Sequence, residues 1–380
     1  MKNFLHGIAD YIRETDKLLL LICLTASFYG TVLIYSATYS TGDIRQVLVQ
    51  AASVAIGVAA AIFISLFDYK TIARRWYIWV GLCVALLIVT FIWGYAPQGT
   101  SNKAWLELPG GMSFQPSELV KIAFIITFSL HIHKVRDQIN RPKNLLLLCA
   151  HGAFPALLIH FLQGDDGTAL ILAFIFACML FVSGVKLRYF IIAGAALAAA
   201  APFIWFFVLN SYQRNRILIV FNPESDLLGN GWQQWRGRIA IGSGGLTGYG
   251  FLQGPRIQSG NVPKAYNDFI FATAGEELGF FGCMAVLILL CALCLRILRV
   301  ARLSRDKMGA MICTGVFAMF SIQTIVNIGM CLSLLPVIGI TLPFFSAGGT
   351  SLVSLFIGIG LILSVYIHRG RRRIYLRDDF

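Results

Sequence analysis

The residues best placed to do chemistry are three carboxylates around the end of the longest polar connection. Asp268 stands where a polar stretch gives way to an apolar one, and Glu276 and Glu277 follow inside the apolar part. Ionisable groups within a membrane-spanning segment are costly and usually functional. A helix from residue 269 rises 1.5 Å per residue, which would put Glu276 roughly 12 Å below Asp268. The sequence thus predicts Asp268 at the mouth of a site and not in its floor, at a loop-to-helix junction where a carboxylate can act as the helix N-cap.

The elements that carry these residues are membrane-spanning helices. The chain has 380 residues, of which 57% are hydrophobic and 13% charged, with a mean hydropathy of +0.74. This composition predicts an all-α polytopic membrane protein with about ten transmembrane helices, in which one large extracytoplasmic loop joins helices seven and eight. The apolar runs lie near 18–37, 47–67, 76–95, 116–132, 144–162, 168–185, 188–210, 269–295, 308–330 and 347–368.

The distribution of basic residues predicts the orientation. Most of the 31 lysines and arginines fall in the tails and in alternate loops, so both termini are expected in the cytoplasm. This topology and anionic membrane lipids account for the net charge of +13 without a nucleic acid. We expect one integral-membrane domain, 1–380, with a cytoplasmic amphipathic segment at 1–16, the large extracytoplasmic loop at 211–268 and a basic cytoplasmic tail at 369–380.

Two further charged residues lie in the fourth predicted span. Glu118 and Lys121 are three positions apart, so they share one face of a helix. They form an internal ion pair or hold a group of a substrate, because charges inside a membrane bundle face its interior or a water-filled cavity.

Asp165 and Asp166 form a sharp acidic turn between two spans. They could cap the following helix, bind a cation or lie beside a reaction centre. A binding site for a divalent cation, Mg²⁺ or Mn²⁺, near Asp165 is therefore one of the alternatives. The nine cysteines all fall in apolar runs and are interpreted as small core residues.

The large loop is rich in arginine on the side that is normally depleted of positive charge. Guanidinium groups chelate phosphate oxygens, so a phosphate-binding surface is expected. Its candidates are Arg214, Arg216, Arg236 and Arg238. The glycine-rich run 242–250 lacks the ending of a nucleotide phosphate loop, and no nucleotide is expected; close backbone approach or a flexible hinge explains the glycines better.

A second irregular stretch, 334–351, is apolar yet interrupted by proline and glycine. Non-helical backbone at membrane depth is tolerated where it is buried in protein or lines a cavity. We expect this stretch, with Ser346, Gly348 and Gly349, to frame the same cavity as Asp268, with Glu276 and Glu277 in structural or cavity positions.

These segments, in this order, resemble the SEDS family (shape, elongation, division and sporulation). The matching stretches are 115–121 (QPSELVK), 162–168 (LQGDDGT), 221–226 (FNPESD), 240–245 (AIGSGG), 267–271 (NDFIF), 276–279 (EELG) and 334–351. This chain departs from the family pattern in three places. Gly164 and Asp166 replace a proline and a leucine, and Arg236 and Gly237 replace a glutamine and a serine. The run 346–351 reads SAGGTS in place of the family's SYGGSS.

The resemblance implies a ten-helix, inverting peptidoglycan glycosyltransferase in the bacterial cytoplasmic membrane. It would polymerise lipid II into nascent glycan at the outer face together with a class B penicillin-binding protein, a transpeptidase. It implies that Asp268 is the general base; the loop arginines would stabilise the departing pyrophosphate. The short tails favour the elongation type within the family.

Two other classes of function fit some of these features. A lipid II flippase, or another carrier of lipid-linked substrates, would use Glu118, Lys121, Glu276 and Glu277 as a charged path. Such carriers often contain inverted repeats, and no convincing pair of matching halves is found. A scaffold that only recruits a partner would leave the buried charges without a purpose.

Overall fold

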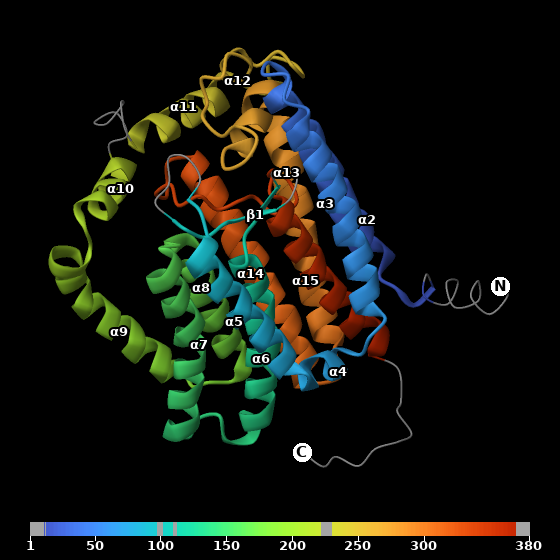
Figure 1. Ribbon diagram of the computed structural model, residues 1–380, viewed down its shortest axis with the longest axis vertical. Coiled ribbons are helices and arrows are strands. Elements are labelled where there is room, and N and C mark those ends of the chain that lie inside the picture. Colours follow the sequence, from blue (N-terminus) through green and yellow to red (C-terminus); the bar gives the residue numbers. More distant parts are fainter. Residues whose placement is uncertain (1–10, 12, 97–101, 109–111, 222–229, 370–380) are drawn as a thin grey trace.

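The structure is a computed structural model, and it describes residues 11, 13–96, 102–108, 112–221 and 230–369. The described part is a helical bundle with one small antiparallel hairpin (Figure 1). Its elements are α2 (Lys17–Tyr39), α3 (Arg45–Ser65), α4 (Tyr69–Arg74), α5 (Trp76–Trp93), β1 (Leu106–Leu108), β2 (Met112–Phe114), α6 (Ser117–Val135), η1 (Arg136–Gln138), α7 (Pro142–Gln163), α8 (Asp166–Ser183), α9 (Leu187–Phe203), η2 (Ile204–Val208), α10 (Ser211–Phe221), α11 (Asn230–Ser243), α12 (Pro255–Gln258), α13 (Ile270–Leu303), α14 (Lys307–Cys331) and α15 (Gly349–His368).

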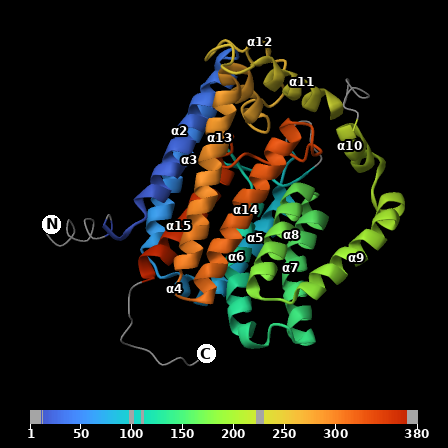
Figure 2. The ribbon, with the colours of Figure 1, turned by 180° about the vertical axis from the view of Figure 1, so that it is seen from behind.

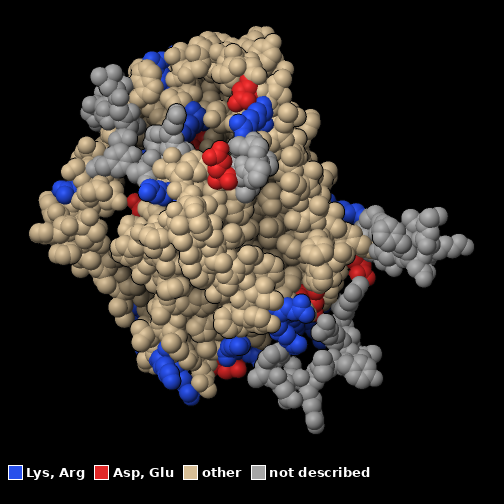
Figure 3. All heavy atoms as spheres, viewed as in Figure 1, with Lys and Arg blue, Asp and Glu red and all other residues tan. Residues whose placement is uncertain are grey.

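Among the described residues, nine helical segments are long and apolar enough to cross a membrane, with α9 and η2 counted as one segment. They match nine of the ten predicted spans, and the tenth prediction, 116–132, falls on the bundle helix α6. That helix is less apolar because it carries Glu118, Lys121 and Lys134. On the face shown in Figure 3, most charged side chains lie toward the two ends of the molecule, and the surface between them is largely uncharged. The chain is therefore a multi-pass membrane protein.

Contacts along α2 define the two ends of the bundle. At the end that we call the terminus end, Asp16 accepts two hydrogen bonds from Arg296 at 2.7 and 2.9 Å. At the opposite end, which we call the loop end, Ser36 donates to Glu277 at 2.5 Å. The predicted amphipathic segment 1–16 and basic tail 369–380 lie mostly outside the described residues.

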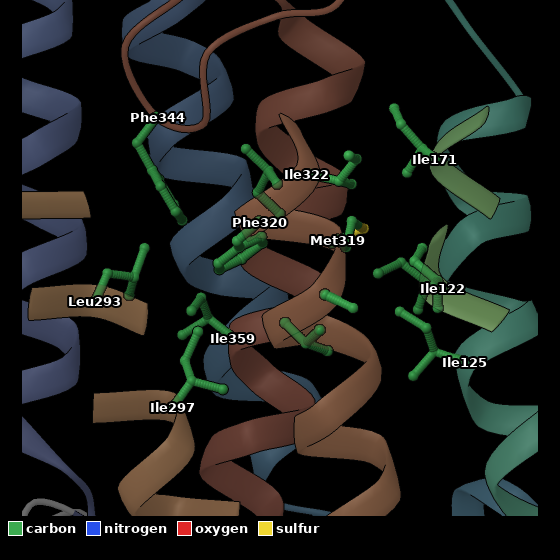
Figure 4. Close-up of a cluster of buried hydrophobic side chains, with 14 of the residues drawn as sticks. Ile122, Ile125, Ile171, Leu293, Ile297, Met319, Phe320, Ile322, Phe344 and Ile359 are labelled. Atoms are coloured by element: carbon green, nitrogen blue, oxygen red, sulfur yellow. The ribbon is translucent and has the colours of Figure 1, made fainter. Parts of the chain in front are cut away.

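The core is centred on α14 and α15, whose side chains are mostly buried. Phe320 of α14 and Ile359 of α15 lie in one cluster with Leu293 of α13 and Ile122 of α6 (Figure 4). Phe344, from the irregular segment after α14, packs edge-on against Phe320 and Phe356. By contrast, α9 has no buried residue and lies at the edge of the bundle (Figure 2). The central pair therefore provides the rigid frame for the loop end.

The predicted depth of Asp268 relative to Glu276 is wrong. Gly279 has φ 64° and ψ −156°, so the helix that begins at residue 270 is interrupted there and the chain folds back. Tyr29 of α2 donates to the carbonyl of Gly282, and the Cys283 thiol lies 3.9 Å from the carbonyl of Phe271. Segment 270–278 therefore runs antiparallel to the rest of α13, toward the loop end. Asp268 lies deeper in the bundle than Glu276 and Glu277.

The large connection folds into helices that the sequence analysis did not anticipate, namely α10, α11 and the short α12. The glycine-rich run after α11 packs on the reversed segment of α13. Tyr249 and Gly250 donate backbone hydrogen bonds to the carbonyls of Glu276 and Glu277 at 3.0 and 2.9 Å. A Cβ at Gly248 would lie 2.1 Å from the Glu277 carbonyl oxygen, which confirms that the glycines permit close backbone approach.

We expect Gly279→Ala to destabilise the fold severely. The residue has a backbone conformation that favours glycine, and a Cβ there would lie 2.4 Å from the backbone nitrogen of Gly248. Backbone strain of this kind costs about 1–3 kcal/mol, and the overlap adds to it. Gly194→Ala is the matched control, because a Cβ in that helix meets nothing within 4 Å. Thermal unfolding in detergent measures both; equal midpoints would contradict the reversal at Gly279.

Candidate active-site cavity

A cavity of about 1140 Å³ opens at the loop end between α3, α6, α8, α10, α11 and the two irregular segments. It brings together residues that are far apart in the sequence. The predicted residues that line it are Glu118, Asp165, Arg216, Asp268, Gly348 and Gly349. Further charged or titratable lining residues are Arg45, Tyr95, His160, Asp166, Lys264 and Tyr266. A concave site of this size, with charged side chains in a mixed polar and apolar lining, accommodates a large ligand.

Asp268 is held in the wall of this cavity by its backbone. Its carbonyl accepts hydrogen bonds from the Asn327 amide at 3.0 Å and from the Cys331 thiol at 3.6 Å, both on α14. The residue as a whole is buried. The N-cap of α13 is Phe269, with no side-chain cap hydrogen bond. The N-cap interpretation of Asp268 is therefore wrong, because its carboxylate does not cap α13.

The irregular segment after α14 docks on the loop that carries Asp268. Ser346 donates its hydroxyl to the carbonyl of Asn267 at 2.7 Å, and Ala347 donates its backbone N–H to the carbonyl of Tyr266 at 3.0 Å. The Asn327 side-chain amide also donates a hydrogen bond to the backbone carbonyl of Ile340 at 2.7 Å. The prediction that this segment frames the cavity of Asp268 is confirmed, with Gly348 and Gly349 in the lining and Ser346 behind it.

Lys264 is the charged partner of Asp268, and the sequence analysis missed it. Its ammonium lies 3.8 Å from Asp268 Oδ2. Burial raises the pKa of the Asp268 carboxyl above its usual value, and the nearby Lys264 cation opposes that rise. The spacing of four residues before Asp268 was the available signal. It was not informative without the turn that brings the two side chains together.

Glu118 and Lys121 form the predicted ion pair. The Lys121 ammonium is fully buried and lies 2.7 Å from Glu118 Oε1, while Ser354 of α15 donates to Glu118 Oε2 at 2.9 Å. Glu118 lines the cavity, but Lys121 lies behind it. The pair thus joins α6 to α15 and presents one acidic side chain to the cavity.

Asp165 caps α8, which is one of the three roles left open for it. It accepts hydrogen bonds from the backbone N–H and hydroxyl of Thr168 at 3.0 and 2.7 Å, and from the Gln115 amide at 2.9 Å. Asp166 contacts His160 at 2.6 Å. The described part of the chain contains no group of three or more His, Cys, Asp or Glu side chains that could hold a metal ion. The Asp165 oxygens are already hydrogen-bonded, so the protein groups near it do not fit a ready cation site.

Glu276 and Glu277 anchor the loop end, outside the lining of the cavity. Glu276 accepts backbone N–H bonds from Arg256 and Ile257 at the start of α12, at 3.2 and 2.8 Å. Glu277 accepts from Gln258 at 2.8 Å and from Ser36. Carboxylates saturated in this way hold segments together, so these two acids have the predicted structural position.

The four candidate arginines of the large connection occupy different environments. Arg216 lines the cavity, whereas Arg214, Arg236 and Arg238 are not among its lining residues. Arg214 donates to the carbonyl of Leu209 at 2.9 Å. Arg236 stacks on Trp232, with its guanidinium 4.0 Å from the ring centroid. Of these four arginines, the structure therefore places only Arg216 in the lining of the cavity.

Fold and cavity together define a multi-pass membrane protein with a large cavity, lined in part by charged side chains, at one end of the bundle. The family model FtsW/RodA/SpoVE, described as a cell cycle protein, matches residues 16–371. The chain belongs to this family.

Individual relatives extend the match over nearly the whole chain. Peptidoglycan glycosyltransferase MrdB of Escherichia coli K12 is 34% identical over 93% of this chain and 94% of its own. Stage V sporulation protein E of Bacillus subtilis is 33% identical over 92% and 96%.

Solved structures of other proteins also match this chain over nearly its whole length. One from a study of the coordination of polymerization and crosslinking by a peptidoglycan synthase complex matches with a TM-score of 0.81 and 27% identity, covering 94% of this chain and 99% of that one. The rod shape determining protein RodA of Thermus thermophilus matches with a TM-score of 0.69 and 25% identity, covering 94% and 98%.

We expect Glu118→Ala to lower the folded yield severely, because it leaves the fully buried Lys121 ammonium without its partner. Breaking a buried pair from one side typically costs about 3–5 kcal/mol. Glu118→Gln keeps an acceptor for Lys121 and should cost less. Fluorescence-detected size exclusion and thermal unfolding of the purified variants measure the effect. If Glu118→Ala unfolded at the wild-type temperature, the pair would not support the bundle.

Proposed function

We propose that this chain polymerises lipid II into glycan strands at the outer face of the bacterial cytoplasmic membrane, with Asp268 as the general base. The family and the relatives named for the activity make the chain a peptidoglycan glycosyltransferase. The nature of the lipid-linked substrate, the orientation and the residue roles are the proposed part. The MrdB relative and the RodA structure support the elongation type.

One observation favours Asp268 as the base over the other buried acids. Glu118, Asp165, Glu276 and Glu277 all have carboxylate oxygens occupied by close hydrogen bonds. The contact of the Asp268 carboxylate with Lys264, at 3.8 Å, is longer than a hydrogen bond. A general base needs a lone pair that is free to take a proton. Asp268 also lines the cavity, and among these acids it best meets that requirement.

The reaction is a single displacement at an anomeric carbon. As the acceptor hydroxyl oxygen forms its bond to this carbon, its proton passes to Asp268, and the bond to the pyrophosphate oxygen breaks with its electron pair. Attack opposite the leaving group converts an α-linked donor into a β-linked product, which is inversion. Asp268 then returns its proton to water. General-base contributions of this kind are typically about 10²–10⁴-fold.

Stabilisation of the departing pyrophosphate is assigned to cations in the same cavity. Arg216 and Arg45 line it from α10 and α3. Guanidinium groups pair with phosphate oxygens in a planar, bidentate geometry, and they stabilise the negative charge that develops on the leaving group. A divalent cation would supply the same stabilisation if it entered with the pyrophosphate, and no protein group is assigned to hold it.

The orientation follows from the positive-inside rule. The terminus end carries Lys70, Arg136, Arg141 and Lys307, so we place it in the cytoplasm and the cavity at the outer face. This placement suits a class B penicillin-binding protein as the partner that crosslinks the product. The solved chain that resembles this one comes from a study of a peptidoglycan synthase complex, which supports that assignment.

We expect Asp268→Asn to insert and fold normally while glycan synthesis from labelled lipid II falls by about 10²–10⁴-fold, because an amide cannot take the proton. Asp137→Asn is the control, since that exposed acid lies at the terminus end. Gel analysis of polymer made by reconstituted protein is the measurement. A well-folded Asn variant that polymerises at the wild-type rate would remove Asp268 from the role of base.

Two arginine variants should separate binding from stability. Arg216→Gln should raise the lipid II concentration needed for half-maximal activity and leave the unfolding midpoint near wild type. Arg236→Gln should lower the midpoint, because it removes a guanidinium stacked on Trp232; such contacts contribute about 0.5–2 kcal/mol. Substrate titration and thermal unfolding of both proteins measure this. The opposite pattern would reverse the two assignments.

A further inference from the structure

We infer that Lys264 is a positioning residue for the proposed reaction: its ammonium holds the buried Asp268 carboxylate ionised and in place, ready to accept a proton. The inference rests on the proposed role of Asp268 as the base. It goes beyond that role, because it explains how an acid this deeply buried stays charged before substrate arrives.

The geometry of the pair carries the inference. Asp268 has a side chain that is 5% exposed, while the Lys264 side chain is 43% exposed and its ammonium lies 3.8 Å from Asp268 Oδ2. Both residues line the cavity. The cation therefore keeps much of its hydration while it approaches a carboxylate that has lost nearly all of its own. Desolvation is costly mainly for the acid, and the cation offsets it.

The backbone conformation of Lys264 also helps to hold Asp268 in its position. Its φ is 53°, in the left-handed region that residues other than glycine seldom adopt. Its carbonyl accepts hydrogen bonds from the backbone N–H groups of Asn267 and Phe269, at 3.0 and 3.1 Å. These two residues flank Asp268, so the turn closed by Lys264 fixes the acid. Strained conformations that persist in this way often lie at functional sites.

The other groups around Asp268 cannot replace this cation. Tyr266 of the same loop is the neighbouring titratable side chain, and burial, with Asp43 and Asp268 nearby, raises its pKa, so it is neutral at pH 7. From α14, the Asn327 amide and the Cys331 thiol contact the Asp268 carbonyl, not its carboxylate. From the segment after α14, Gly339 faces Asp268, because a Cβ at that position would lie 3.8 Å from Asp268 Oδ2, and glycine brings no charge. Among the described residues, Lys264 alone forms an ion pair with Asp268.

The first test is the pH profile of polymerisation by the full-length protein in lipid II liposomes. An opposite charge within about 4–6 Å lowers the pKa of a carboxyl by about 1–3 units. In Lys264→Met, the acid limb of the profile should move up by at least about one pH unit, with activity approaching wild type above it. Lys264→Arg should restore the wild-type limb, since a guanidinium supplies the same charge.

The second test needs no substrate. Because burial raises the pKa of folded Asp268 above its unfolded value, its contribution to stability is complete below the unfolded pKa and is lost as pH rises through the folded one. Without Lys264 the folded pKa is higher, so the decline in unfolding midpoint should extend to higher pH. Adding Asp268→Asn to Lys264→Met should remove this extension.

The outcomes separate the inference from the proposed function. An active Asp268→Asn protein would overturn the proposed base, while the substrate-free midpoints would still report on the ion pair. If Asp268→Asn is inactive and Lys264→Met keeps both the wild-type acid limb and the wild-type midpoints, the inference is wrong. Activity lost equally at every pH in a folded Lys264→Met protein would also overturn it, since Lys264 would then bind substrate.

Discussion

The structure of the loop end depends on satisfying the hydrogen bonds of non-helical backbone inside a membrane bundle. Two irregular segments, 262–269 and 332–348, enter the bundle where water is scarce, and their polar groups need partners. Asn327 serves both segments at once, through the carbonyls of Asp268 and Ile340. Gln234 of α11 bonds the carbonyl of Leu335 at 2.6 Å. Because these side chains belong to rigid helices, the cavity wall takes its position from the helices.

The same constraint explains the reversal at Gly279. Segment 270–278 would be an ordinary start of a membrane helix if the chain continued straight. Folding it back lets the carbonyls of Glu276 and Glu277 accept hydrogen bonds from the glycine-rich run, and lets both carboxylates accept from α12 and its neighbours. Through the reversal, the two buried carboxylates gain hydrogen-bond partners in the large connection and hold it to the bundle. It also places Asp268 deeper than either of them.

Features that depend on local pattern could be predicted from the sequence. The lengths of the apolar runs indicated the spans, and the spacing of Glu118 and Lys121 indicated a pair on one helix face. The proline and glycine residues of 334–351 indicated irregular backbone at a cavity. The reversal could not be predicted, because helical periodicity is the same on both sides of Gly279 and only its backbone angles differ. Lys264 was missed for a similar reason, since its contact depends on a left-handed turn.

The depth of Asp268 has a consequence for the kind of substrate that the cavity can accept. A soluble sugar donor could react at an acid on the membrane surface, and burying the base would only raise its pKa. A lipid-linked donor has its reactive carbon close to the lipid, near the headgroup level of the bilayer. An acid set below the loop end can meet that carbon while the lipid chain stays in the membrane. In the proposed mechanism, the energetic cost of burying Asp268, which the Lys264 ammonium at 3.8 Å would offset, is the cost of bringing the proposed base to an amphiphilic substrate.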